Sequence, residues 1–267
     1  MYNLHRLEPN GTVTLDELPT RGEEYCADRD QAETDFKKLR KELREWQSRL
    51  YAAEDQKLLV VLQALDAGGK DGTIRRVFQG VNPQGVRVTS FKAPTPRELK
   101  HDYLWRIHQA APAAGMIGVF NRSHYEDVLA VRVHHIVPKS VWRSRYEQIN
   151  QFESLLNDTG TKIIKIFLHI SKREQKERFE ERLQIPEKNW KFSHDDLEKR
   201  KHWEDYKSAF QEMLERCTTV YAPWHVIPAD QKWYRNAAVA NLLVTTLREM
   251  DPQYPAPPSG LDDVVVE

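Results

Sequence analysis

The chain has 267 residues, enough for one large domain or two small ones with a hydrophobic core. Its 40 Lys and Arg residues balance 40 Asp and Glu residues, and a net charge of zero predicts no global attraction to nucleic acid or to an anionic membrane. Any polyanion must therefore meet a local basic patch. The two distant cysteines, Cys26 and Cys217, argue against a disulfide scaffold or a zinc ribbon and favour the reducing cytoplasm. Because no apolar run approaches the roughly 18 residues of a membrane span, the expected protein is soluble.

The first 55 residues are interpreted as a polar, turn-rich arm over 1–25 and then a helix. Between Gln31 and Asp55 apolar residues recur at alternating spacings of three and four, which predicts one helical stripe. The positions between them carry a run of positive charge that is typical of a solvated face but could also border a polyanion channel. This run consists of Lys37, Lys38, Arg40, Lys41 and Arg44.

Short apolar segments then alternate with helical segments, which is typical of a parallel α/β sheet flanked by helices. The five predicted strands cover 57–65, 86–91, 116–120, 162–168 and 224–227. Helices are predicted over 74–81, 98–109, 140–156 and 233–249. A further helix is predicted to begin at the capping box that starts with Ser171. A proline-rich tail over 252–260 is predicted to be irregular. We expect a single domain over 1–267.

One stretch, 183–193, interrupts the alternation because it lies between two charged helices without a strand. It is interpreted as the tip of a helical excursion over about 178–200. In α/β phosphotransferases such excursions are lids that exclude water during transfer, although a plain surface hairpin fits the same pattern.

The first predicted strand leads into a glycine-rich segment and then a helix, which is the setting of a phosphate-binding loop. Ala64 and Asp71 replace the first glycine and the Ser or Thr of the G-x-x-x-x-G-K-[ST] pattern, so an ordinary glycine turn is the alternative. Asp66 within the loop would repel phosphate unless a cation lay between them, which suggests a metal. The candidate phosphate-binding residues are Ala67, Gly68, Gly69, Lys70, Asp71, Gly72 and Thr73.

A second polar segment, 120–127, follows the third predicted strand, and ligands in parallel sheets lie beyond the carboxyl ends of strands. Arg122 offers a planar fork for phosphate, whereas Glu126 and Asp127 offer oxygen ligands or a base. Local pairing of Arg122 with these acids is the structural alternative. In the helix before the excursion, Arg178 and Arg182 lie one turn apart on one face. Arginines at these positions are expected in a lid over a phosphoryl transfer, whereas the alternative is a solvent-exposed helix whose charges form salt bridges with each other.

Three segments together resemble the polyphosphate kinase 2 family over essentially the whole chain after residue 30. They are 65–73 (LDAGGKDGT), 120–127 (FNRSHYED) and 190–197 (WKFSHDDL). The resemblance implies a thymidylate-kinase-like P-loop fold and reversible, Mg²⁺-dependent transfer of a terminal phosphate between inorganic polyphosphate and a nucleotide. Many members carry an acid where this chain has Asn121. The version found here is similar to the subgroup that accepts nucleoside mono- and diphosphates, AMP and ADP with GMP and GDP as further candidates.

On this reading Asp66 and Asp127 hold Mg²⁺, Lys70 and Arg122 neutralise the transition state, Glu126 serves the acceptor, and Arg178 and Arg182 act from the lid. Asp71 disfavours the alternative of an ATP-dependent nucleoside monophosphate kinase. A non-catalytic nucleic-acid-binding or regulatory module is disfavoured by the zero net charge. We expect a cytoplasmic homo-oligomer, because most soluble oligomers are symmetric assemblies of one chain.

Overall fold

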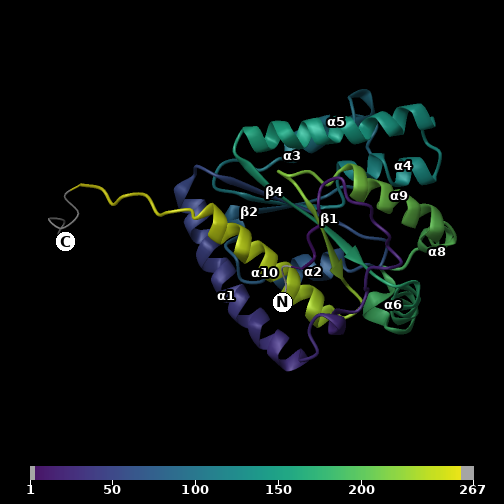
Figure 1. Cartoon of the computed structure of the whole chain (residues 1–267), viewed down its shortest axis with the longest axis horizontal. Helices are drawn as coiled ribbons and strands as arrows, with labels where there is room; N and C mark the ends of the chain where they lie inside the picture. Colours follow the sequence, from purple (N-terminus) through teal and green to yellow (C-terminus); the bar gives the residue numbers. More distant parts are fainter. Residues whose placement is uncertain (1–3, 260–267) are drawn as a thin grey trace.

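A computed structural model describes residues 4–259 of the chain, which form a sheet between two layers of helices (Figure 1). The sheet has five parallel strands in the order β2-β3-β1-β4-β5. These strands are β1 (Lys57–Gln63), β2 (Val86–Ser90), β3 (Ile117–Asn121), β4 (Thr161–His169) and β5 (Trp224–Pro228). The predicted fold class, a parallel five-stranded α/β sheet, is confirmed.

The helices connect and cover these strands. They are α1 (Arg29–Ala53), α2 (Lys70–Val77), α3 (Trp105–Ala110), α4 (Ala130–Val133), α5 (Lys139–Asp158), α6 (Lys172–Gln184), α7 (Pro186–Asn189), α8 (His194–Lys201), α9 (Trp203–Arg216) and α10 (Lys232–Met250). Short 3-10 turns are η1 (Gly22–Glu24), η2 (Pro83–Gly85), η3 (Glu98–Lys100) and η4 (His124–Asp127).

Alternate residues of β1 build the cores on the two faces of the sheet. Leu58, Val60 and Leu62 pack with α1, α2 and α10, whereas Leu59 and Val61 pack with α3, α5 and α9. Figure 1 shows α1 and α10 on one side of the sheet and α5 and α9 on the other. Strands buried on both faces read as continuous apolar runs, which is why the sequence predicted them well.

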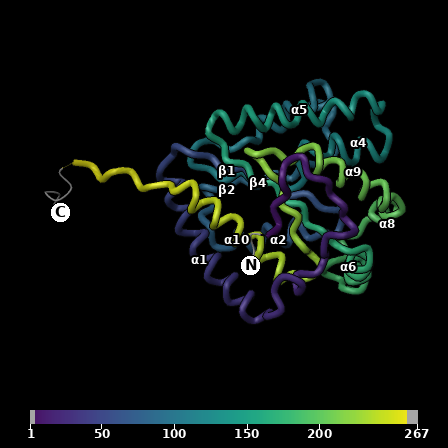
Figure 2. Tube along the Cα trace, viewed as in Figure 1, coloured from purple at the N-terminus to yellow at the C-terminus, as the bar shows by residue number. Residues whose placement is uncertain are grey.

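The N-terminal arm packs against β5 at the edge of this sheet. Arg6 forms an antiparallel bridge with His225 of β5, and the arm then contacts α9 through Glu215, which accepts a hydrogen bond from the Val13 amide at 3.0 Å. Further along, the Thr20 hydroxyl donates to Asp230 at 2.8 Å. Figure 2 shows this purple trace running across the molecule before α1 begins.

Two predicted helices differ in extent from those observed. The helix expected over 98–109 is split into η3 and α3, because His101 is extended (φ −116°, ψ 172°) and stacks on Trp105 with ring centres 4.0 Å apart. The helix expected from Ile74 starts at Lys70, directly after Gly69, whose φ of 103° an ordinary side chain would disfavour. The stretch 183–193 is helical at its tip, in α7, and the chain returns through α8.

Candidate active site

The loop 64–69 turns the chain from β1 into α2 at the carboxyl end of the sheet. Ala67 and Gly69 both have left-handed φ values, 60° and 103°. A Cβ on Gly68 would lie 2.5 Å from the Ala64 Cβ, and one on Gly69 would lie 2.1 Å from an Arg235 nitrogen, so both positions require glycine. The tight turn leaves the backbone amides at the start of α2 available to an anion.

Lys70 lies buried beneath this loop, with 8% of its surface exposed. Its Nζ donates a hydrogen bond to the Ala64 carbonyl at 2.9 Å. Burial lowers the pKa of Lys70 to about 8, an effect that the nearby Arg122 reinforces and that Asp66 opposes. The ammonium is therefore poorly solvated, and an incoming phosphate would find a cation with little competing water.

Asp66 and Arg122 form an ion pair that joins the ends of β1 and β3. The two strands are neighbours, with Leu62 opposite Asn121, which brings the residues that follow them together. Arg122 has a left-handed φ of 62°, and its other terminal nitrogen lies 3.4 Å from Glu126. Burial alone would raise the pKa of Asp66, but the surrounding cations, Arg122 first, lower it, so the carboxylate stays ionised.

Asn121 binds the second loop carboxylate. Its amide nitrogen donates to Asp71 at 2.6 Å and lies 3.3 Å from the Ser90 hydroxyl. An aspartate at position 121 would place two carboxylates in contact, whereas the amide supplies a donor. The asparagine is therefore matched to the aspartate that replaces the usual Ser or Thr of a phosphate loop.

Asp127 lies apart from Asp66. Its carboxylate accepts from Arg145 of α5 at 2.9 Å, and it lines neither of the cavities that Asp66 lines. Burial raises the pKa of Asp127 to about 6 although Arg145 and Arg106 oppose this. The two residues expected to share a metal ion therefore line no common cavity, because η4 turns Asp127 toward α5.

The two arginines expected on the lid have different surroundings. Arg178 is 7% exposed and donates to the carbonyls of Ala67 at 2.8 Å and Ala229 at 2.5 Å, so it fastens α6 to the phosphate loop and to the end of β5. Arg182 instead pairs with Asp196 of α8 at 3.1 Å, within the excursion itself. Their one-turn spacing therefore does not give them a common partner.

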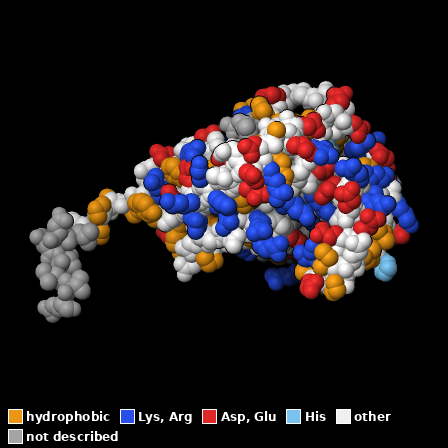
Figure 3. Space-filling model, turned by 90° about the horizontal axis from the view of Figure 1, so that it is seen from below, with side chains coloured by type: hydrophobic (Ala, Val, Ile, Leu, Met, Phe, Trp, Pro, Cys, Tyr) orange, Lys and Arg blue, Asp and Glu red, His pale blue; other side chains and the backbone are white. Residues whose placement is uncertain are grey.

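A cavity of about 1070 Å³ contains most of the predicted site residues. Residues 66–72, Arg122, Arg178 and Arg182 line it, and basic side chains of four further segments also line it. These are Arg29, Lys37 and Arg40 of α1, Arg75 and Arg76 of α2, Lys188 and Lys191 of the excursion, and Lys232 and Arg235 of α10. Lys and Arg side chains also gather across the middle of the face seen in Figure 3.

Arg235 is the most deeply buried of the basic cavity residues that the sequence did not reveal. It is 3% exposed, and its guanidinium donates hydrogen bonds to the neighbouring Asn236 side chain. Burial followed by the charge of Arg178 lowers the pKa of Arg235 to about 9, and Glu174, the acid that opposes this, pairs with Arg178. Because α10 reads as an ordinary apolar helix, only the fold shows that this guanidinium lies beside Gly69.

The parallel sheet, the glycine loop at its carboxyl edge and the paired carboxylate and guanidinium define a P-loop kinase-like phosphotransferase. The chain belongs to the polyphosphate kinase 2 family: the family model Polyphosphate kinase 2 (PPK2) matches residues 26–255. It is 50% identical to an AMP/ADP-polyphosphate phosphotransferase of Meiothermus ruber over 98% of this chain and 99% of that protein. It is 42% identical to an ADP-polyphosphate phosphotransferase of Rhodopseudomonas palustris over 91% and 88%.

A solved structure agrees with this assignment. The crystal structure of polyphosphate kinase 2 from Arthrobacter aurescens TC1 superposes with a TM-score of 0.94, at 39% identity, over 98% of this chain and 93% of that chain. The family resemblance expected from the three sequence segments is therefore confirmed. Among residues 4–259 no helix is long and apolar enough to cross a bilayer.

Proposed function

We propose that this enzyme transfers the terminal phosphate of inorganic polyphosphate to AMP and ADP, reversibly. The observation that carries the proposal is the single cavity in which a phosphate loop, the Asp66–Arg122 pair and basic side chains of α1, α2 and α10 face one another. The full-length relative from Meiothermus ruber is named for this activity. An elongated polyanion requires a lining of this kind, because the net charge of the chain is zero.

The loop carboxylates support a requirement for Mg²⁺. This ion is usually held by one or two carboxylates and completes its shell with substrate phosphates and water. Asp66 and Asp71 both line the cavity, and among the described residues no group of three His, Cys, Asp or Glu side chains forms a closed metal cage. The donor set fits an ion shared with the substrate, and when bound there Mg²⁺ would supply charge neutralisation between phosphate oxygens.

The chain's own residues then position and neutralise the transferred phosphate. Lys70 and the amides at the start of α2 would bind the oxygens of the transferring group, and Arg122 would bind those on the acceptor side. No covalent enzyme intermediate is needed, because phosphoryl transfer depends on alignment of the attacking and leaving oxygens. Arg235 beside Gly69 would supply a further cation to the donor chain.

We further propose that residues 178–200 act as a lid over this cavity. Lys188 and Lys191 of the excursion line the same cavity as the phosphate loop, and Lys199 of α8 lies 3.9 Å from Asp66. A lid that carries cations would complete the site and exclude water from the transfer. Because Arg178 is fixed to backbone carbonyls, Arg182 and the lysines are the groups that lid movement would carry.

The decisive experiment is incubation of the protein with long-chain polyphosphate, Mg²⁺ and AMP in the absence of ATP, followed by nucleotide chromatography. We expect ADP to rise first and ATP to follow, with ADP alone also converted and GMP and GDP tested as further acceptors. Failure of both AMP and ADP to react would overturn the proposal. A product that forms only when ATP replaces polyphosphate would instead identify a nucleoside monophosphate kinase.

The oligomeric state and the cellular location of this enzyme are also proposals. We expect a homo-oligomer, because most soluble oligomers are symmetric assemblies of one chain. We expect a cytoplasmic location, since the two cysteines are buried and unpaired. Light scattering of the purified full chain and fractionation of the source cells test the two expectations separately.

A further inference from the structure

A fully buried ionic cluster lies behind the site, on the α5 and α9 side of the sheet. At its centre is Lys165 of β4, which has no exposed surface. Its ammonium donates to the Glu153 carboxylate at 2.6 Å, the Tyr125 hydroxyl at 2.9 Å and the Cys217 carbonyl at 2.5 Å. These contacts use all the donors of the lysine and connect β4 to α5, η4 and the end of α9.

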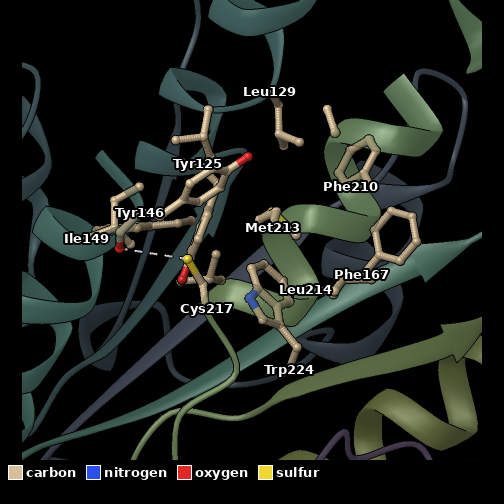
Figure 4. Close-up of a cluster of buried hydrophobic side chains, with 14 of the residues drawn as sticks. Tyr125, Leu129, Tyr146, Ile149, Phe167, Phe210, Met213, Leu214, Cys217 and Trp224 are labelled. Carbon is tan, nitrogen blue, oxygen red and sulfur yellow. Dashed lines mark hydrogen bonds between the residues drawn. The ribbon is translucent and has the colours of Figure 1, made fainter. Parts of the chain in front are cut away.

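Glu153 completes the cluster from α5. Its Oε1 accepts from the Tyr125 hydroxyl at 2.7 Å and lies 3.2 Å from the His124 Nε2, which therefore carries the proton. Burial would favour the neutral acid, but Lys165 and His124 lower the pKa of Glu153 and keep it ionised. Figure 4 shows Tyr125, Cys217 and Trp224 converging on this part of the core from separate elements.

The cluster binds one particular turn of the chain. Tyr125 and His124 belong to η4, the turn that begins two residues after Arg122 and contains Glu126. Ser123, which precedes the turn, is also fully buried, and its hydroxyl donates to the side-chain oxygen of Gln63, at the end of β1, over 3.1 Å. Arg122 thus lines the cavity of the phosphate loop, and Glu126 lines the smaller cavity beside it, which Asp66 and Arg122 also line. The side chains between them in the sequence are held in the core.

Energetics distinguish this cluster from ordinary core packing. A buried ion pair gains little over apolar residues of similar volume, since desolvation of the two charges offsets their attraction. Its hydrogen bonds, in contrast, allow only one arrangement of the groups around it. Stability alone therefore does not account for an ion pair at this position, whereas precise placement of η4 does.

We propose that the Lys165–Glu153 pair, acting through Tyr125 and His124, positions Arg122 and Glu126 for phosphoryl transfer to the acceptor nucleotide. These are positioning residues: none of the four lines the cavity that holds the phosphate loop. The inference rests on the proposed function and adds to it a dependence of the chemical step on a cluster outside the substrate cavity.

The first test is Tyr125→Phe, which keeps the packed ring and removes the hydroxyl. The second is Lys165→Met combined with Glu153→Leu, which replaces the ion pair with apolar groups of similar volume and avoids an unpaired buried charge. The matched control is Val244→Ala, a buried truncation in α10 on the opposite face of the sheet. Thermal unfolding followed by circular dichroism identifies a temperature at which all variants are fully folded. The kcat and KM values are measured at that temperature.

In both cluster variants we expect kcat with AMP to fall about tenfold or more and the KM for polyphosphate to stay within about twofold of the wild-type value. This is the result expected when Arg122 and Glu126 lose the orientation that they need in the transition state. The polyphosphate lining on α1, α2 and α10 lies across the sheet and is unaffected. The control, Val244→Ala, should have a lower melting temperature than the wild type and the same kcat. Cluster variants that keep kcat, or that raise only the KM for polyphosphate, would overturn the inference. An inactive wild type would instead refute the proposed function.

Discussion

Individual charges in the site are balanced by close partners rather than by water. The Asp66 carboxylate is bound by Arg122, the Asp71 carboxylate by Asn121, and the Lys70 ammonium by a backbone carbonyl. Substrate must therefore exchange these contacts for contacts with phosphate and metal. Such exchange makes the protonation state of each group in the free enzyme measurable in kcat/KM.

Lys70 should limit activity at alkaline pH. Its pKa is lowered to about 8, so the free enzyme loses this cation as the pH rises through that value, and kcat/KM for polyphosphate should fall above it. Lys70→Arg keeps its positive charge at high pH, so its kcat/KM should no longer fall above about pH 8, although its kcat/KM at every pH should be lower than that of the wild type. Lys70→Ala should lose at least about 10²-fold in kcat at every pH. A pH profile of Lys70→Arg that matches the wild type would assign the limb to another group.

Asp66 and Asp127 should respond differently to removal of charge. Asp66→Asn should lower kcat about 10²–10³-fold, and excess Mg²⁺ should partly restore it, since the carboxylate faces the phosphate loop. Asp127→Asn should have a smaller effect that Mg²⁺ does not change, because its partner is Arg145. Measuring rate against Mg²⁺ concentration for both variants decides between them. Equal rescue of both would restore the expectation that they share one ion.

At the scale of elements, the site is formed where two neighbouring strands end and a helical excursion returns. The β1 loop and the β3 turn are held side by side by the strand register, and α6 is fastened over them by Arg178. The tip of the excursion, α7 and α8, is held to the end of α6 by ion pairs between side chains, Arg182 with Asp196 and Lys188 with Glu181, rather than by buried contacts with backbone carbonyls. Movement is therefore expected at this tip and not along α6.

The two arginines of α6 should separate stability from catalysis. Arg178→Ala should lower the melting temperature and the activity together, because it leaves the carbonyls of Ala67 and Ala229 without a donor. Arg182→Ala should leave the melting temperature nearly unchanged and lower kcat more than it raises the KM for polyphosphate. Arg173→Ala, an exposed residue of the same helix, is the control. Unchanged kcat in Arg182→Ala would mean a plain surface hairpin.

For the whole molecule, a net charge of zero conceals an uneven distribution of charge. Basic residues of α1, α2 and α10, which lie far apart in the sequence, line one cavity. Their field acts on a polyanion at short range and is weakened by dissolved salt. Polyphosphate binding should therefore depend on ionic strength although the molecule as a whole is neutral.

Added salt should weaken polyphosphate binding through the cavity lysines. An increase of about tenfold in NaCl, which shortens the Debye length roughly threefold, should raise the KM for polyphosphate severalfold. Lys37→Gln should raise this KM at low salt and reduce its salt dependence. Lys162→Gln removes an exposed lysine outside the cavity and should change neither. A wild-type KM that does not respond to salt would exclude an electrostatic polyphosphate track.

Much of the site was predictable because its contacts are local or follow directly from the sheet. Lys70, Gly69 and Asp66 occupy one loop after one strand, and Arg122 follows the neighbouring strand, so spacing and parallel topology suffice to bring them together. The separate placement of Asp127 was not predictable, since the direction of η4 depends on Tyr125 and its buried partners. The same holds for Arg178, which the sequence places one turn from Arg182 without showing that its partners are backbone carbonyls.

The amino-acid sequence by itself determined the parallel sheet, the phosphate loop and the family, because buried strands and glycine turns follow from periodicity and backbone sterics. The tertiary structure alone decided which charges meet: Asn121 with Asp71, Asp127 with Arg145, Lys165 with Glu153, and Arg235 beside Gly69. The physical reason is distance along the chain. These contacts are set by the packing of whole helices against the sheet. The sequence around a charged residue therefore does not show which distant residue will become its partner.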